Sequence, residues 1–200
     1  MDVVSYERLG LFVREAFLTR NGVSALMRLA ARAPGEPGVV GVDGGTQIAR
    51  DVRRVETLDL PPEVSDDLDR RFDRLRPELE RFFGVPLGWA EPATALRYRP
   101  GDFYRAHRDR VTSLDAFYRS RRISAVLFAN DATTPPAAGG FSGGALRFHG
   151  LMEGNAGPGQ AIDVPPLAGT LLAFRSETLH EVLPVHDGRR ITVVTWFHSA

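Results

Sequence analysis

Residues 180–197 read HEVLPVHDGRRITVVTWF, and this stretch says most about the fold. A run rich in β-branched and aromatic residues ends at His180, turn residues fill Pro184–Gly188, and a second run begins at Arg189. Side chains alternate between the two faces of a strand. The second run therefore predicts one face with Arg190, Thr192, Val194 and Trp196, and another with Arg189, Ile191, Val193 and Thr195.

Four more short runs of this composition precede it, separated by clusters of Gly, Pro, Asn and Asp. They are Ala93–Tyr98, Ile123–Asn130, Ala145–Phe148 and Gly169–Phe174. No helical periodicity lies between them, which disfavours a parallel sheet built from β–α–β units. The pattern predicts a mainly β architecture, an antiparallel sandwich or barrel, with the N-terminal helices packed on one sheet.

The first third of the chain has helical periodicity instead. Apolar residues recur at helical spacing within residues 19–31, and again from Leu68 to Phe82. We expect Ser65 to cap the second helix, Pro77 to bend it and Gly84 to end it. Residues 47–60 predict one strand between the helices. We expect a single domain over residues 1–200, with a helical support region at 1–86 and the β core that carries the site at 87–200.

Composition excludes several classes of chemistry. The chain has 25 basic and 25 acidic residues and no cysteine, and every one of its basic residues is arginine. Disulfides, thiolate metal sites, cysteine nucleophiles and lysine Schiff bases are therefore excluded. The balanced charge gives no basic footprint for nucleic acid or for a membrane surface. No apolar run approaches the ~20 residues of a membrane span, and the N-terminus lacks a signal-peptide pattern, so we expect a cytoplasmic protein.

Two of the five histidines lie in sequence contexts that suggest a metal site. His107 and Asp109 lie two residues apart in a segment that we interpret as extended, so their side chains point the same way. His180 follows about seventy residues later. Two imidazoles and one carboxylate form the facial triad that suits non-haem Fe(II) and leaves positions open. An H-x-D tripeptide taken alone is most often a surface pair, so the surrounding residues have to support this hypothesis.

An arginine that points inward beside such a metal would be a buried cation, which is costly unless it binds an anion. A carboxylate is the natural partner of its planar fork. Arg190 and Arg189 are both candidates, because a shift of one residue exchanges the two faces. The residues therefore suggest a metal with open positions beside a small molecule that bears a carboxylate.

From about Leu96 to Phe197 the chain resembles the Fe(II)- and 2-oxoglutarate-dependent dioxygenases of the prolyl 4-hydroxylase superfamily. The matching pieces are Y-x-x-G-x-x-Y-x-x-H-x-D from Tyr98 to Asp109, RRISAVLFAN, GGALRF, and HEVLPV-x-x-G-x-R-x(5)-W. The resemblance implies a double-stranded β-helix, a cupin-like jelly-roll with flanking helices. It further implies that His107, Asp109 and His180 bind iron.

The resemblance also implies the cosubstrate site. Arg190 would bind the distal carboxylate of 2-oxoglutarate, with Arg189 as the second choice, and Tyr98 would hydrogen-bond the cosubstrate or line its pocket. The family usually has a tyrosine where this chain has Phe128, which removes one hydrogen bond worth about 0.5–1.5 kcal/mol. Thr192 on the neighbouring strand could replace it.

The implied activity is hydroxylation of an unactivated C–H bond of a peptide or protein side chain such as proline, with Fe(II), 2-oxoglutarate and O₂, and with release of succinate and CO₂. A free amino acid or a small biosynthetic intermediate is the alternative substrate. A metal-holding jelly-roll binding module is the non-enzymatic alternative. Related halogenases vacate the carboxylate position, so the presence of Asp109 favours hydroxylation.

The remaining candidates concern the substrate. We expect Tyr104, Phe128 and His149 to contact it, and the long loop Asp131–Gly144 to lie on its approach. We expect Glu181 to point away from the site because its neighbour His180 points in. The arginines at 105, 108 and 110 either form a solvated edge, which we favour, or steer an anionic substrate. Solvent exposure is expected for His186 and His198.

Overall fold

The C-terminal strand β17 (Arg190–Ser199) runs through the middle of the larger of two facing sheets. In the computed structural model, which describes residues 3–42, 44–112, 114–151 and 161–200, it pairs with β10 (Arg121–Phe128) on one side and β8 (Thr94–Tyr98) on the other. Both pairings are antiparallel. The strand is buried over nearly its whole length because it is covered on both faces.

The larger sheet has the strand order β1-β14-β10-β17-β8-β6-β2, and β7 pairs with the far end of β17. The remaining strands of this sheet are β1 (Phe12–Arg14), β14 (Leu171–Arg175), β6 (Glu56–Leu58), β2 (Gly35–Pro37) and β7 (Leu87–Ala90).

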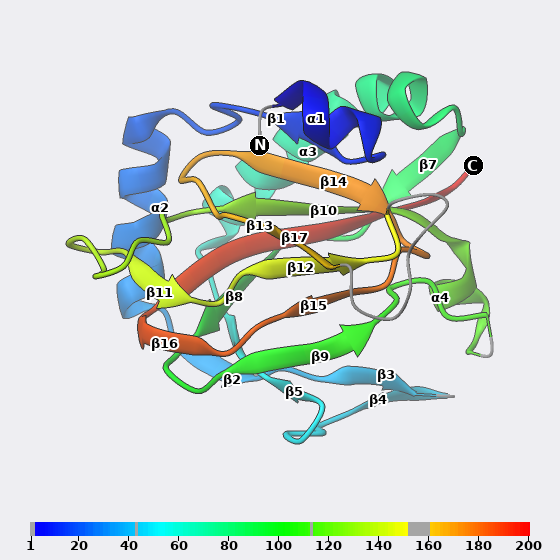
Figure 1. Cartoon of the computed structure of the whole chain (residues 1–200). Coiled ribbons are helices and arrows are strands. Elements are labelled where there is room, and N and C mark those ends of the chain that lie inside the picture. The colour runs from blue at the N-terminus through cyan, green and yellow to red at the C-terminus, as the bar shows by residue number, and fades with distance from the viewer. Residues whose placement is uncertain (1–2, 43, 113, 152–160) are drawn as a thin grey trace.

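The smaller sheet has the order β13-β12-β15-β9-β5 and lies across the larger one (Figure 1). Its strands are β13 (Ala161–Val164), β12 (Leu146–His149), β15 (His180–Val182), β9 (Phe103–His107) and β5 (Arg53–Arg54). Two two-stranded sheets complete the β structure: β11 (Phe141–Gly143) with β16 (Val185–Gly188), and β3 (Val40–Val42) with β4 (Gly45–Gln47).

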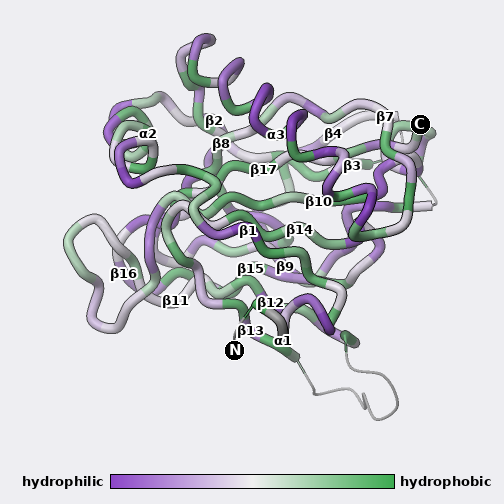
Figure 2. Tube along the Cα trace, turned by 90° about the horizontal axis from the view of Figure 1, so that it is seen from above, coloured by the Kyte–Doolittle hydropathy of each residue, from purple (hydrophilic) through white to green (hydrophobic). Residues whose placement is uncertain are grey.

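Two apolar clusters fix the order of the layers. One fills the space between the sheets and includes Leu96, Val126 and Phe174, and the other lies between the larger sheet and the helices. Figure 2 shows these layers from above, with α3 (Pro62–Phe83), then β17 and β10, then β9 and β12. The predicted alternation along β17 is confirmed, because Ile191, Val193 and Phe197 belong to the helix-facing cluster.

The two long helices cover one face of the larger sheet, as expected. α2 (Arg20–Arg32) begins at Thr19, whose side chain accepts a hydrogen bond from the Gly22 amide, and α3 packs its apolar stripe from Leu68 to Phe83. Two shorter helices are α1 (Val3–Arg8) and α4 (Ala116–Ser120). Within the described residues, no helix combines the length and the hydropathy that a membrane crossing requires.

Three local predictions were wrong. Ser65 does not cap α3, because the helix starts three residues earlier at Pro62, a residue that favours the first helical turn. The single strand predicted over 47–60 is divided among β4, β5 and β6, which belong to three different sheets. The first third of the chain also adds β1 and β2 to the larger sheet, and neither strand was predicted. Strands β1, β2 and β5 are short edge strands whose pairing depends on partners distant in the sequence.

Candidate metal centre and anion pocket

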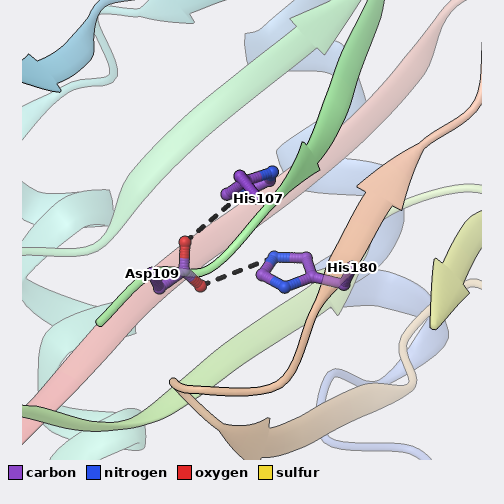
Figure 3. A group of neighbouring side chains, drawn as sticks. All are labelled: His107, Asp109 and His180. Carbon is purple, nitrogen blue, oxygen red and sulfur yellow. Dashed lines mark ion pairs between the residues drawn. The ribbon is translucent and has the colours of Figure 1, made fainter. Parts of the chain in front are cut away.

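Three potential metal ligands converge between the two sheets. His107 ends β9, Asp109 follows two residues later, and His180 begins β15. The neighbouring strands β9 and β15 pair with His180 opposite His107, which brings together two imidazoles that lie 73 positions apart in the sequence. One ligand atom from each of the three residues lies within 4.8 Å of the others (Figure 3).

Both imidazoles present the same nitrogen to this cluster. Nδ1 of His107 lies 2.8 Å from the carbonyl oxygen of Arg105, and Nδ1 of His180 lies 3.0 Å from that of Thr178. A carbonyl only accepts, so each Nδ1 carries the hydrogen and each Nε2 keeps its lone pair. The hydrogen bond from Nδ1 to a backbone carbonyl therefore sets the tautomer that a metal ligand needs.

Asp109 lies between the two imidazoles. Its Oδ1 is 3.4 Å from Nε2 of His107, and its Oδ2 is 3.6 Å from Nε2 of His180. Donor atoms that share an ion at about 2.0–2.2 Å are separated by about 3–3.5 Å, so the spacing fits one metal ion. Burial alone would raise the pKa of Asp109, but His180, His107 and the Ser124 hydroxyl hold it well below its usual range. The carboxylate is therefore ionised and ready to bind a cation.

Aromatic rings hold the imidazoles in place. Tyr104 stacks on His107 with ring centroids 3.5 Å apart, and Phe174 meets His180 edge-on at 4.6 Å. Burial, together with the neighbouring His107, lowers the pKa of His180 to about 4. Both effects keep the His180 imidazole neutral near pH 7, which is the form that binds a metal.

A buried cation lies in the same pocket. Arg190 is 1% exposed, and its guanidinium lies over the ring of Tyr98 at 5.0 Å. Its Nη1 donates to the Thr192 hydroxyl at 3.3 Å, but its buried Nε has no hydrogen-bond partner. Burial lowers the pKa of Arg190 to about 10, so it remains charged at neutral pH. Arg189, by contrast, is exposed and lies outside this pocket.

Of the residues expected to contact substrate, the structure brings only Tyr104 into the pocket wall. Phe128 is buried next to Arg190, with its ring 5.7 Å from the guanidinium, and does not line the pocket. His149 faces the other side of the smaller sheet, where it lies 3.0 Å from Glu181. No residue of the loop at 131–144 is part of the pocket wall.

The expected exposure of His198 was wrong, whereas that of His186 is confirmed. His198 is 1% exposed, because β17 continues past Trp196 and pairs His198 with Arg121 of β10. Its two ring nitrogens contact Ser120 Oγ at 2.7 Å and Glu91 Oε1 at 2.9 Å. It is part of a buried polar network and not of the metal cluster.

Sequence reasoning missed two residues near the cluster. Ser124 donates a hydrogen bond to Asp109, and alternation along β10 could have found it, since Ser124 shares a face with Val126. Arg53 lines the pocket from β5. No local signal identifies it, because its position depends on the pairing of β5 with β9.

The residues present fit the groups that the resemblance implies. Two imidazoles that direct Nε2 to the cluster and one carboxylate are a donor set for Fe(II) with open coordination positions. A buried guanidinium whose Nε lacks a partner is suited to a carboxylate such as that of 2-oxoglutarate.

Comparison with known proteins agrees with this chemistry. The family model described as the 2OG-Fe(II) oxygenase superfamily matches residues 93–198. The chain is 30% identical over 171 residues to a PKHD-type hydroxylase of Maricaulis maris, covering 79% of this chain and 66% of that protein. It is 36% identical over 104 residues to a PKHD-type hydroxylase of Synechococcus elongatus, covering 52% of this chain and 41% of that protein. The chain thus spans only part of the length of these curated relatives.

Solved structures include prolyl hydroxylases of the same fold. A Pseudomonas putida prolyl-4-hydroxylase has a TM-score of 0.73 at 28% identity, covering 99% of this chain and 97% of that chain. A Trichoplax adhaerens prolyl hydroxylase, in complex with a hypoxia inducible factor peptide fragment, has a TM-score of 0.73 at 15% identity, covering 98% and 87%. The predicted fold class, mainly β of jelly-roll type with flanking helices, is therefore confirmed. Since the family model covers more than half of its length, the chain belongs to the 2OG-Fe(II) oxygenase superfamily, whose cofactors are Fe(II), 2-oxoglutarate and O₂.

Proposed function

We propose that this protein is a hydroxylase that oxidises an unactivated C–H bond of a peptide side chain such as proline. The observation that carries the proposal is a single pocket that contains both a His-Asp-His cluster and a buried arginine with an unpartnered Nε. A metal-holding module without catalysis would have no use for the arginine. Removing the arginine from water costs free energy that only an anionic ligand offsets.

His107 and His180 would hold the metal through Nε2, and Asp109 through a carboxylate oxygen. Three protein ligands on one side leave the other positions open. With Fe(II) and 2-oxoglutarate bound, the centre would couple oxidative decarboxylation of 2-oxoglutarate, to succinate and CO₂, with insertion of one oxygen atom of O₂ into the substrate C–H bond. The protein needs no general base for this chemistry.

Arg190 would bind the distal carboxylate of 2-oxoglutarate. Its free Nε and its Nη1 are the donors, and the Thr192 hydroxyl, 3.3 Å from Nη1, could add a third. Tyr98 packs against the guanidinium and would border the cosubstrate. Phe128 supplies no hydroxyl, so Arg190 and Thr192 would carry this recognition.

The apolar walls of the pocket would exclude water from the oxidant. They include Leu96, Val126, Leu146, Val182 and Val194. Exclusion of water from the pocket prevents side reactions of the reactive centre.

A peptide substrate is supported by the relatives. The Pseudomonas putida protein that shares 28% of its sequence with this chain is a prolyl-4-hydroxylase. A free amino acid or small metabolite is the second candidate, because one scaffold serves many substrates.

Two measurements test the proposal. Anaerobic addition of Fe(II) and 2-oxoglutarate to the metal-free protein should produce a weak visible charge-transfer band. Succinate release should then be stimulated by peptides that contain proline more than by free amino acids. Absence of the band would contradict the enzymatic assignment, and stimulation by free amino acids alone would replace the peptide with the second candidate.

A further inference from the structure

A second arginine in the metal pocket, Arg53, also has an Nε without a hydrogen-bond partner. Among the described residues, only two buried side-chain nitrogen or oxygen atoms have no hydrogen-bond partner, and they are the Nε atoms of Arg53 and Arg190. Both arginines line the pocket that contains His107, Asp109 and His180. The distal carboxylate of 2-oxoglutarate is the proposed anionic partner of Arg190, whereas Arg53 has no proposed partner.

Arg53 lies close to the metal ligands. Its guanidinium is 4.7 Å from the ring centroid of Tyr104, which in turn is 3.5 Å from that of His107. The guanidinium is thus no more than about 8 Å from the His107 ring. One end of the side chain is fixed, because Nη1 donates to the carbonyl oxygen of Val39 at 2.6 Å. No carboxylate of the described residues forms an ion pair with it, although eight other arginines have such partners.

The charges of the filled pocket leave Arg53 unbalanced. Fe(II) and Arg190 would carry three positive charges, Asp109 and the 2-oxoglutarate dianion three negative ones, and imidazoles that ligate a metal add no charge. Arg53 adds one positive charge that nothing else in the pocket compensates. A buried or half-buried cation of this kind favours an anionic partner.

The excess of positive charge continues outward from Arg53. Arg53 also lines a neighbouring groove together with three exposed arginines, Arg50, Arg54 and Arg99. The two acidic residues of this groove are already engaged: Glu56 pairs with Arg97 and Arg99, and Asp102 accepts the Arg99 amide. A positive groove that leads away from the pocket fits an extended acidic chain better than one small molecule.

We propose that Arg53 binds a carboxylate of the substrate, and that the substrate is a peptide with an acidic residue close to the hydroxylated residue. This inference rests on the proposed function and specifies its substrate. Consecutive residues of an extended peptide lie about 3.3–3.6 Å apart along the chain. The distance of Arg53 from His107 therefore places the acidic residue within about two positions of the oxidised one.

Matched peptide pools test the proposal. Each pool has a central proline and random flanks, and carries Glu in one case and Gln in the other at the four positions nearest the proline. Dissociation constants are measured with Fe(II) and 2-oxoglutarate in the absence of O₂, and succinate release is measured in air. The native protein should bind the Glu pool at least ten-fold more tightly, and it should have a correspondingly lower KM for that pool.

Substitution of the arginine should remove this discrimination. Arg53→Met should reduce the preference for Glu to less than two-fold, whereas Arg32→Met, an exposed arginine of α2, should retain it. A purely structural Arg53 would change the binding of both pools equally. Arg53→Lys, which keeps the charge and loses the planar fork, should retain a preference of a few-fold and serves if the methionine variant does not fold.

The failures can be told apart. Equal affinity of the native protein for the two pools, or binding of neither pool while the anaerobic band forms, overturns the role of Arg53 and leaves the hydroxylase assignment standing. Absence of the band overturns the proposed function itself.

Discussion

The hydroxyl group of Ser124 donates a hydrogen bond of 2.7 Å to Oδ2 of Asp109. A second serine, Ser176, lies 2.9 Å from the Ser124 hydroxyl, and both side chains are buried. The contact occupies one oxygen of the carboxylate and restricts its rotation. The metal centre therefore depends on a residue that is not itself a ligand.

We expect Ser124→Ala to weaken Fe(II) binding about 10–100-fold, because partners that orient a ligand usually have effects of this size. Titration of the metal-free protein with Fe(II) under anaerobic conditions measures the change. Ser24→Ala, on the exposed side of α2, is the matched control and should bind Fe(II) normally. Unchanged affinity in Ser124→Ala would show that Asp109 is held without the serine.

His107→Ala should abolish the charge-transfer band formed with Fe(II) and 2-oxoglutarate, because two protein ligands do not replace a facial set of three. His186→Ala removes an exposed imidazole and should leave the band intact. Visible absorption spectra recorded under anaerobic conditions measure the band in both variants. Equal loss in the two would contradict the assigned ligands.

Arg190→Met should change thermal stability and cosubstrate affinity in opposite directions. Burial lowers the pKa of Arg190 to about 10, which reflects the cost of holding this cation out of water. Replacement by an apolar side chain of similar length should raise the Tm of the ligand-free protein by about 2–6 °C, while the affinity for 2-oxoglutarate falls at least 100-fold.

Arg189→Met is the control for this experiment, since Arg189 is exposed one residue away. It should change neither quantity appreciably. If 2-oxoglutarate binding instead depended on Arg189, the assignment of the carboxylate site would move by one residue.

Two ion pairs of nearly identical geometry differ in burial, which allows a direct test of what burial does. Arg121 contacts Glu91 at 2.6 and 2.8 Å, and Arg147 contacts Asp163 at 2.6 and 2.9 Å. The first pair has side-chain exposures of 10% and 11%, the second of 34% and 43%.

We expect Glu91→Gln to cost about 3 kcal/mol and to lower the Tm by about 6–12 °C, because it leaves Arg121 buried without its counter-charge. Asp163→Asn should cost less than about 1 kcal/mol. Thermal unfolding of both variants measures the difference. Comparable losses would indicate that bulk solvent reaches the Glu91 carboxylate.

Much of the β core can be predicted from sequence because it depends on neighbours along the chain. Alternation puts Arg190 and Thr192 on one face of β17, and the packing of the two sheets makes it the inner face. The same rule turns Glu181 away from His180. Extending that rule by two residues would also have buried His198. The prediction of exposure is wrong because the pairing of β17 with β10 continues to this residue.

The residues that could not be predicted owe their positions to distant partners. The imidazole of His149 has the chemistry of a site residue. The pairing of β12 with β15, however, directs it toward Glu181 on the outer face of the smaller sheet. Arg53 lies in a segment with no strong periodicity, and only the two-residue strand β5 brings it against β9. The register of such short strands is set by the sheet to which they add.

The amino-acid sequence by itself determined the donor set, an extended His-x-Asp and a histidine at a strand end, because both follow from chain-local alternation and residue chemistry. It limited the anion-binding arginine to Arg189 or Arg190. The tertiary structure alone decided that the donor set shares one pocket with Arg190 and Arg53, and that these two arginines keep an unpartnered nitrogen there. The reason is physical: solvation and ion pairing depend on the packing of segments far apart in sequence, and no local pattern encodes that packing.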